Sequence, residues 1–75
     1  MKLKMMTLDG ATIIETNAVT QFSPDHSHGG NYTKIETVNA DGTFAEAVVK
    51  HDFYQVTQAL ARAWALDEGR SATHA

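Results

Sequence analysis

The chain has 75 residues, of which 43% are hydrophobic and 20% charged, the composition of one small globular domain rather than of a disordered segment. It contains no cysteine, which excludes disulfide bonds and a thiolate zinc site as supplements to a small core. The net charge of −3 argues against a surface for duplex nucleic acid, because Lys and Arg supply most of the affinity for phosphate.

No apolar run in the sequence approaches the roughly 20 residues that a membrane span requires. The apolar stretch near the N-terminus is broken too early for a signal peptide. We therefore expect a cytoplasmic protein with a single α+β domain over residues 1–69, followed by a frayed tail at 70–75.

The first predicted element is a β-hairpin around Asp9-Gly10. Asp-Gly between two extended runs is a strong hairpin signal, because both central residues of a type I′ turn adopt positive φ. A two-residue loop would place Met6 opposite Ile13 and Lys4 opposite Glu15, and the second pair joins opposite charges. The strand after the turn is expected to continue until Pro24, which lacks a backbone donor, ends it.

A second hairpin is predicted around Asp41-Gly42. With a two-residue loop, Val38 lies opposite Ala45. A three-residue loop would shift the register by one residue and bring Glu36 opposite Glu46, and the repulsion of like charges disfavours that alternative. We therefore expect the two-residue loop.

The last predicted element is an amphipathic helix over residues 52–68. Asp52 is a suitable N-cap, Gln55 completes a pattern like a capping box, and Gly69 is a natural stop. The apolar residues recur at the spacing of one helical face; they are Phe53, Val56, Leu60, Ala63 and Trp64. The expected fold is α+β: two hairpins form a four-stranded antiparallel sheet, and the C-terminal helix packs on one face (ββββα).

The strands carry more apolar residues than one helix can cover. Because side chains alternate between the faces of a strand, Leu3, Met5 and Ile14 cannot share a side with Met6, Leu8 and Ile13. An apolar group therefore stays on the uncovered face, where it can contact a partner. We predict an interaction surface that contains Leu3, Met5, Ile14, Tyr32 and Tyr54.

The stretch from Pro24 to Asn31 has the composition of a surface loop and contains His26 and His28 beside Asp25. Histidine is a common metal ligand, and the aspartate could add a carboxylate oxygen. A zinc site needs three or four protein ligands, however, and His51 would have to come from a distant strand end. We expect a solvated loop without a metal or other cofactor, and keep a small metal-binding protein as an alternative.

The same loop raises the question of nucleophilic catalysis, because Ser23 and Ser27 lie near the histidines. A catalytic triad needs a nucleophile, a base within hydrogen-bond reach and a third group that orients the base. Neighbouring residues on one loop seldom provide that geometry. We expect no catalytic residues and no enzymatic activity.

The order of turns and strands resembles small flagellar and swarming-motility accessory proteins of the FlbD/SwrD type. The likeness covers roughly residues 3 to 60, and the corresponding stretches are TLDG at 7–10, Asn17 with Val19, SPD at 23–25, DGT at 41–43 and VVKHDFYQV at 48–56. This chain departs from that pattern in a longer middle loop, HSHGGN, and a longer helix. The resemblance implies a non-enzymatic accessory protein that acts through protein contacts.

These observations predict a small interaction or regulatory module that binds another protein or its own copy as a homodimer, and they argue against nucleic acid as a partner. One alternative is an inhibitor, encoded by a phage or mobile element, that blocks a host protein complex by occupying its surface. The other is metal binding through the loop of His26 and His28.

Overall fold

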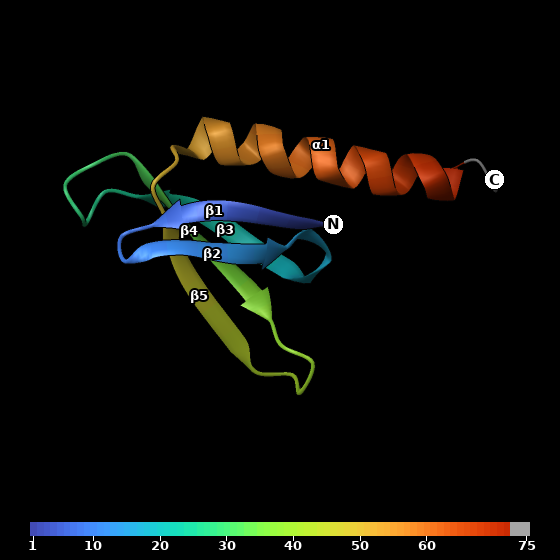
Figure 1. The fold of residues 1–75 in the computed structure, drawn as a ribbon, viewed down its shortest axis with the longest axis horizontal. Helices are drawn as coiled ribbons and strands as arrows, with labels where there is room; N and C mark the ends of the chain where they lie inside the picture. Colours follow the sequence, from blue (N-terminus) through green and yellow to red (C-terminus); the bar gives the residue numbers. More distant parts are fainter. Residues whose placement is uncertain (73–75) are drawn as a thin grey trace.

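The computed structural model describes residues 1–72 and shows a five-stranded antiparallel sheet with one C-terminal helix (Figure 1). The elements are β1 (Lys2–Thr7), β2 (Gly10–Glu15), the short 3-10 helix η1 (Thr16–Ala18), β3 (Val19–Asp25), β4 (Tyr32–Val38), β5 (Phe44–Val49) and α1 (Phe53–Ala72). The strand order in the sheet is β2-β1-β5-β4-β3. The predicted α+β class is confirmed, but the expected count of four strands is wrong.

The additional strand arises because the chain turns at η1. The Thr16 N–H and hydroxyl both donate to the carbonyl oxygen of Met1, at 2.8 and 2.9 Å, and the indole N–H of Trp64 donates to the carbonyl oxygen of Thr16 at 2.9 Å. These contacts end β2, and β3 then pairs with β4 at the opposite edge of the sheet. Pro24 lies inside β3 rather than ending it, which is possible because β3 is an edge strand.

The first hairpin has a different register from the predicted one. Thr7 pairs with Gly10, so Leu8 and Asp9 form the loop and Lys4 lies opposite Ile13. Gly10 adopts a φ of 149°, a backbone conformation that other residues rarely adopt, at the first position of β2. The register differs by two residues from the expected one. Because side chains alternate with a period of two, the residues predicted to share a side of the hairpin still share it.

The second hairpin adopts the register that the sequence disfavoured, and this prediction is wrong. Glu36 lies opposite Glu46, and the loop has the three-residue form in which a glycine, here Gly42 at a φ of 89°, follows a tight turn. The Gly42 N–H donates to the carbonyl oxygen of Asn39 at 3.0 Å, and the Thr43 N–H donates to Asp41 Oδ1 at 3.0 Å. The hydrogen bonds of this turn set the register.

The facing carboxylates of this hairpin are each bound by other polar groups. The Thr20 hydroxyl donates to Glu36 Oε1 at 2.7 Å, and the Gln21 side-chain amide donates to Glu36 Oε2 at 3.2 Å. Lys34 Nζ lies 3.9 Å from Glu46 Oε2. Cross-strand charge pairs contribute only about 0.2–1 kcal/mol, so these contacts and a favourable turn outweigh the repulsion.

Helix α1 begins as predicted and ends later. The Gln55 N–H donates to Asp52 Oδ1 at 2.7 Å, and the Asp52 N–H donates to Gln55 Oε1 at 3.2 Å, which is the reciprocal capping box. The helix passes through Gly69, at a cost of about 1 kcal/mol relative to alanine, and reaches Ala72. The predicted frayed tail is therefore helical over 70–72, and its remainder, 73–75, lies outside the described residues.

The capping box provides a stability test. We expect Asp52→Ala to lower the free energy of unfolding by about 1 kcal/mol, because the N–H of Gln55 loses its acceptor. Asp52→Ser, which keeps an acceptor at the cap, should recover most of the loss. Urea denaturation of the two variants measures the difference, and equal stability of Asp52→Ala and the wild type would contradict this role.

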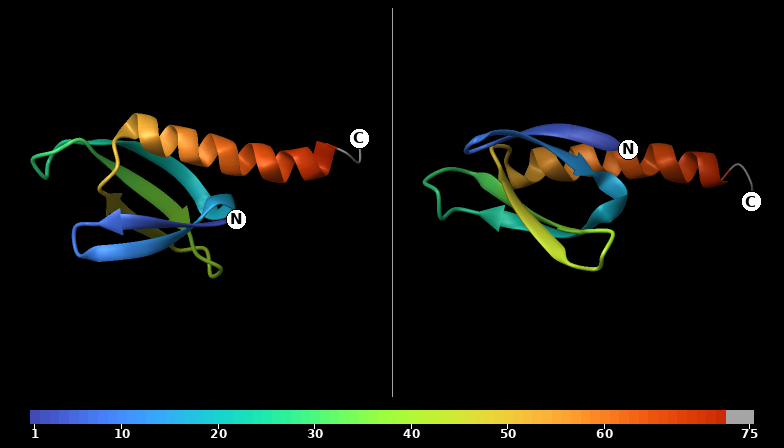
Figure 2. Two further views of the ribbon diagram at one scale, coloured as in Figure 1. Left: turned by 45° about the horizontal axis from the view of Figure 1, so that its top comes forward. Right: turned by 60° about the horizontal axis from the view of Figure 1, so that its bottom comes forward.

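The hydrophobic core lies between the sheet and α1. Its buried residues are Met5, Ile14, Ile35, Val49, Val56 and Leu60, and partly buried side chains, including Phe22 and Trp64, pack against them. Phe22 stacks on Phe53 with ring centroids 5.3 Å apart. Figure 2 shows α1 running along one side of the sheet, with the hairpin of β1 and β2 at a steep angle to β5.

Candidate functional site: the outer side of the first hairpin

The structure reverses the predicted faces of the first hairpin. Met5 and Ile14, which the sequence placed on the interaction surface, are only 5% and 4% exposed in the core, and Leu3 packs against that core. The apolar residues of the opposite side are the uncovered ones: Met6, Leu8 and Ile13 are 49%, 43% and 57% exposed.

Charged residues determine which side of the hairpin is buried. Lys2 and Lys4 alternate with Met5 along β1, and Glu15 lies opposite Lys2 in β2, so all three point to the side of Met6 and Ile13. Burying that side would remove three charges from water, which costs far more than the gain from the apolar residues. The sequence contained this signal, and it would have identified the exposed side.

The uncovered residues form one contiguous group, here called the outer patch: Met6, Leu8, Ala11 and Ile13. Met6 pairs directly with Ala11, and Ile13 is the diagonal neighbour of Met6. Ala11 is also exposed. Single exposed apolar residues are common on soluble domains, whereas contiguous groups of them are less so.

A cleft of about 440 Å³ lies beside the outer patch, where the tip of the first hairpin meets β5. Its lining residues are Thr7, Leu8, Asp9, Ala11, Thr12, Glu46, Ala47 and Val48. The cleft shares Leu8 and Ala11 with the outer patch. The two features therefore form one continuous surface.

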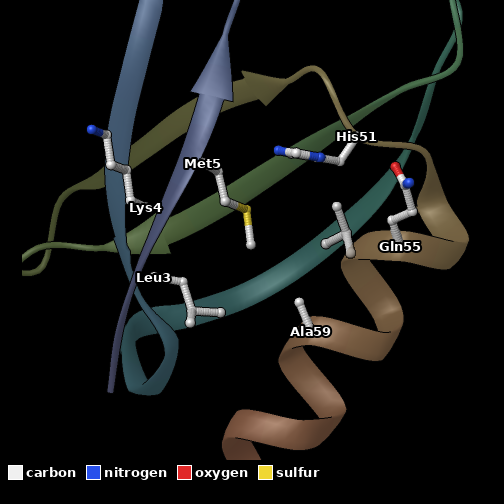
Figure 3. Close-up of a pocket in the computed structure, with 7 residues that line it drawn as sticks. Leu3, Lys4, Met5, His51, Gln55 and Ala59 are labelled. Atoms are coloured by element: carbon white, nitrogen blue, oxygen red, sulfur yellow. The ribbon is translucent and has the colours of Figure 1, made fainter.

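A second, smaller cavity of about 170 Å³ lies between β1 and the start of α1 (Figure 3). Met5 projects from β1 toward the helix at this point, and the side chain of Lys4 turns away from it (Figure 3). His51 Nε2 lies 3.5 Å from the backbone nitrogen of Met6. The cavity is smaller than the several hundred Å³ of a usual small-molecule site.

The two tyrosines of the predicted interaction surface are not part of the outer patch. Tyr32 is half-buried, and its ring lies so close to Gly30 that a Cβ there would be 3.0 Å from ring carbons. Tyr54 is 70% exposed on α1, which covers the other face of the sheet. The structure does not bring the five predicted residues together in one surface.

The histidine loop is held by hydrogen bonds within the loop. Asp25 Oδ1 accepts from the N–H of Ser27 at 2.8 Å and from its hydroxyl at 2.5 Å, and His28 Nδ1 lies 3.6 Å from Asp25 Oδ2. His51 instead lines the cavity beside β1. Among the side chains that the structure describes, no three or more of His, Asp or Glu are grouped so that they could hold a metal ion.

Acidification tests the hydrogen bonds that Asp25 accepts in the histidine loop and Asp41 accepts in the turn of the second hairpin. Donation from the Ser27 hydroxyl lowers the pKa of Asp25 below its ordinary value, and donation from the Thr43 hydroxyl lowers the pKa of Asp41 in the same way. Each carboxylate therefore contributes stability above the unfolded-state pKa, about 3.9, and the contribution is lost as the pH falls through the lower folded-state pKa.

We expect the urea midpoint to fall as the pH drops below about 4. Asp41→Asn, which keeps an acceptor but cannot titrate, should weaken this dependence, and Asp25→Asn should act similarly. An unchanged pH profile in both variants would show that neither carboxylate is linked to folding.

No helix within residues 1–72 is long and apolar enough to cross a membrane. The chain matches no protein-family model, and no curated protein or solved structure matches it significantly. The resemblance to flagellar and swarming accessory proteins therefore stays a prediction from the sequence.

Proposed function

We propose that this protein is a non-enzymatic, cytoplasmic interaction module that binds another protein, or a second copy of itself, through the outer patch. The observation that carries the proposal is the exposure of Met6, Leu8 and Ile13 on one side of the first hairpin. An inhibitor that occupies the surface of a host complex would use the same patch and is one form of this proposal.

The small size of the chain makes uncovered apolar surface costly. A domain of this length buries only about 60% of the surface of its unfolded chain, so each large apolar residue left in water is a substantial loss. Full burial of an exposed Ile or Leu side chain contributes roughly 1.5–3 kcal/mol. Because Met6, Leu8 and Ile13 are each about half exposed, a partner that covers the whole patch gains about this much or somewhat more. The Lys4 and Glu15 side chains beside the patch would form a polar rim of the kind that surrounds an interface core.

Site-specific photo-crosslinking in cells tests the proposal. A benzoylphenylalanine at Leu8, in the outer patch, should give a discrete crosslinked adduct. The same residue at Gln58, which is exposed on α1, is the matched control and should give none. The mass of the adduct distinguishes a second copy from another protein.

Two results would contradict the proposal. One is the absence of an adduct from Leu8 under conditions in which the protein is folded. The other is an equal adduct yield from Gln58, because that yield would reflect collision rather than a defined surface.

A further inference from the structure

We propose that the free edge of β5 binds an extended segment of the partner protein, in which a Lys or Arg lies two positions from apolar residues, so that they share one face of the strand. This inference rests on the proposed function and specifies the partner of the same surface. The segment would add to the sheet as a strand beside Phe44 and Glu46 and would lie in the cleft next to the outer patch.

The pairing of β5 leaves one of its edges open. β4 pairs with β5 along its whole length, from Thr33 with Val49 to Val38 with Phe44. β1 pairs with the opposite edge at one position only, where Thr7 lies opposite Val49. Within the described residues, no strand pairs with that edge from Phe44 to Val48.

Backbone hydrogen bonds show which groups point to the open edge. The N–H of Asn39 donates to the carbonyl oxygen of Thr43 at 2.7 Å, so Thr43 faces the β4 side. The N–H of Lys50 donates to Met6 on the other side at 2.7 Å. Because successive residues of a strand alternate, the N–H and C=O groups of Phe44 and Glu46 point away from β4 and toward the open edge.

The chemistry of the cleft specifies the charge of the segment. Asp9 and Glu46 line it, and none of its lining residues is basic. Lys34 lies 3.9 Å from Glu46, but both side chains are about half exposed, and such surface pairs contribute little. A basic side chain in the cleft can therefore pair with these carboxylates, while apolar residues two positions away, on the same face of the segment, contact Leu8 and Val48.

Besides the outer edge of β2, the free strand edges include those of β3 and of part of β5, and these two differ in a way that favours use of β5 over β3. Free edges attract other strands, and proteins block them with proline or a bulge. β3 carries both: Pro24 lies within it, and a bulge interrupts its pairing between Val19 and Gln21. The open segment of β5 has neither feature, so its backbone groups are accessible to an added strand.

A peptide titration followed by amide chemical shifts tests the inference. The probe is a capped seven-residue peptide, Thr-Val-Thr-Lys-Thr-Val-Thr, and the control replaces its lysine with glutamate. We expect the lysine peptide to shift the amides of Phe44 and Glu46 more than those of Ala45 and Ala47, which face β4. The glutamate peptide should bind about three- to tenfold more weakly, because the exposed carboxylates of the cleft attract lysine and repel glutamate only modestly.

Matched variants separate the backbone contribution from the charge. Glu46→Ala removes the carboxylate and keeps the N–H, so it should weaken binding of the lysine peptide. Glu46→Pro removes both the carboxylate and the backbone N–H, and it should abolish binding. Proline is compatible with the fold at this position because the lost N–H points away from β4. Glu36→Gln, on the neighbouring strand, should bind the peptide like the wild type.

Three results would overturn the inference: equal binding of the lysine and glutamate peptides, shifts confined to β2 or β3, and a second copy of the chain occupying β5 in light scattering and amide spectra. Failure here is distinguishable from failure of the proposed function. If the Leu8 crosslink is observed but the peptide does not bind, only the proposed strand addition is wrong. If neither the crosslink nor peptide binding is observed, the proposed function is wrong as well.

Discussion

Replacing Leu60 with alanine is expected to lower the free energy of unfolding by about 2–5 kcal/mol. Leu60 is fully buried in the cluster that joins α1 to the sheet, and its truncation leaves a cavity that the small core cannot fill. A chain of 75 residues has a total stability of roughly 4–11 kcal/mol, so the loss is a large fraction of the whole. Urea denaturation followed by circular dichroism measures it.

Leu66→Ala is the matched control for this prediction. Leu66 is on the same helix and is 54% exposed, so its truncation should change the free energy of unfolding by less than about 0.5 kcal/mol. A loss at Leu66 equal to the loss at Leu60 would mean that α1 buries a different face.

The largest effect on binding is expected from Ile13→Lys. Ile13 is the most exposed large residue of the outer patch, and a charge there must be desolvated when a partner covers it. We expect the yield of the Leu8 crosslink to fall at least about tenfold, as for a residue at the centre of an interface. The free energy of unfolding should fall by only about 0.2–1 kcal/mol, because the side chain faces solvent and the new lysine lies opposite Lys4.

Leu66→Lys places the same charge at a similarly exposed aliphatic residue on α1. It should leave the crosslink yield unchanged, which separates an effect of the patch from an effect of net charge. If Ile13→Lys retains the wild-type yield, the outer patch is not the contact surface.

Local patterns in the sequence predicted the element types well. The capping box at Asp52 and Gln55 and the spacing of apolar residues from Phe53 onward both correspond to α1. These signals depend on residues within one or two turns of each other. A short stretch of sequence is therefore enough to predict the helix.

The number of strands depends on contacts that are distant in sequence. Thr16 ends β2 because it binds Met1 and Trp64, and Trp64 is 48 residues away. No local pattern reveals that contact. The second hairpin also depends on contacts that the local pattern does not show. Its register, which the repulsion between Glu36 and Glu46 disfavours, is stabilised by the turn at Gly42 and by the hydrogen bonds that β3 donates to Glu36.

The sequence analysis predicted an uncovered apolar side of the first hairpin but chose the side that the structure buries. Alternation along β1 and β2 showed that apolar residues must remain uncovered, and both sides of the hairpin are rich in them. The charged side could have been identified from the sequence, because Lys2, Lys4 and Glu15 all lie on one side of the hairpin. The cleft beside β5 depends on the angle between the hairpin and β5, and the sequence contains no signal for that angle.

Oxidation of the neighbouring methionines shows which side of the first hairpin is uncovered and whether a partner covers it. Met6 is on the uncovered side of β1 and Met5 is in the core, so mild peroxide should oxidise Met6 of the purified protein well before Met5. In cells, a partner on the outer patch should protect Met6 relative to Met1. Tandem mass spectrometry resolves the three sites, and equal oxidation of Met5 and Met6, or an unprotected Met6 in cells, would contradict the account.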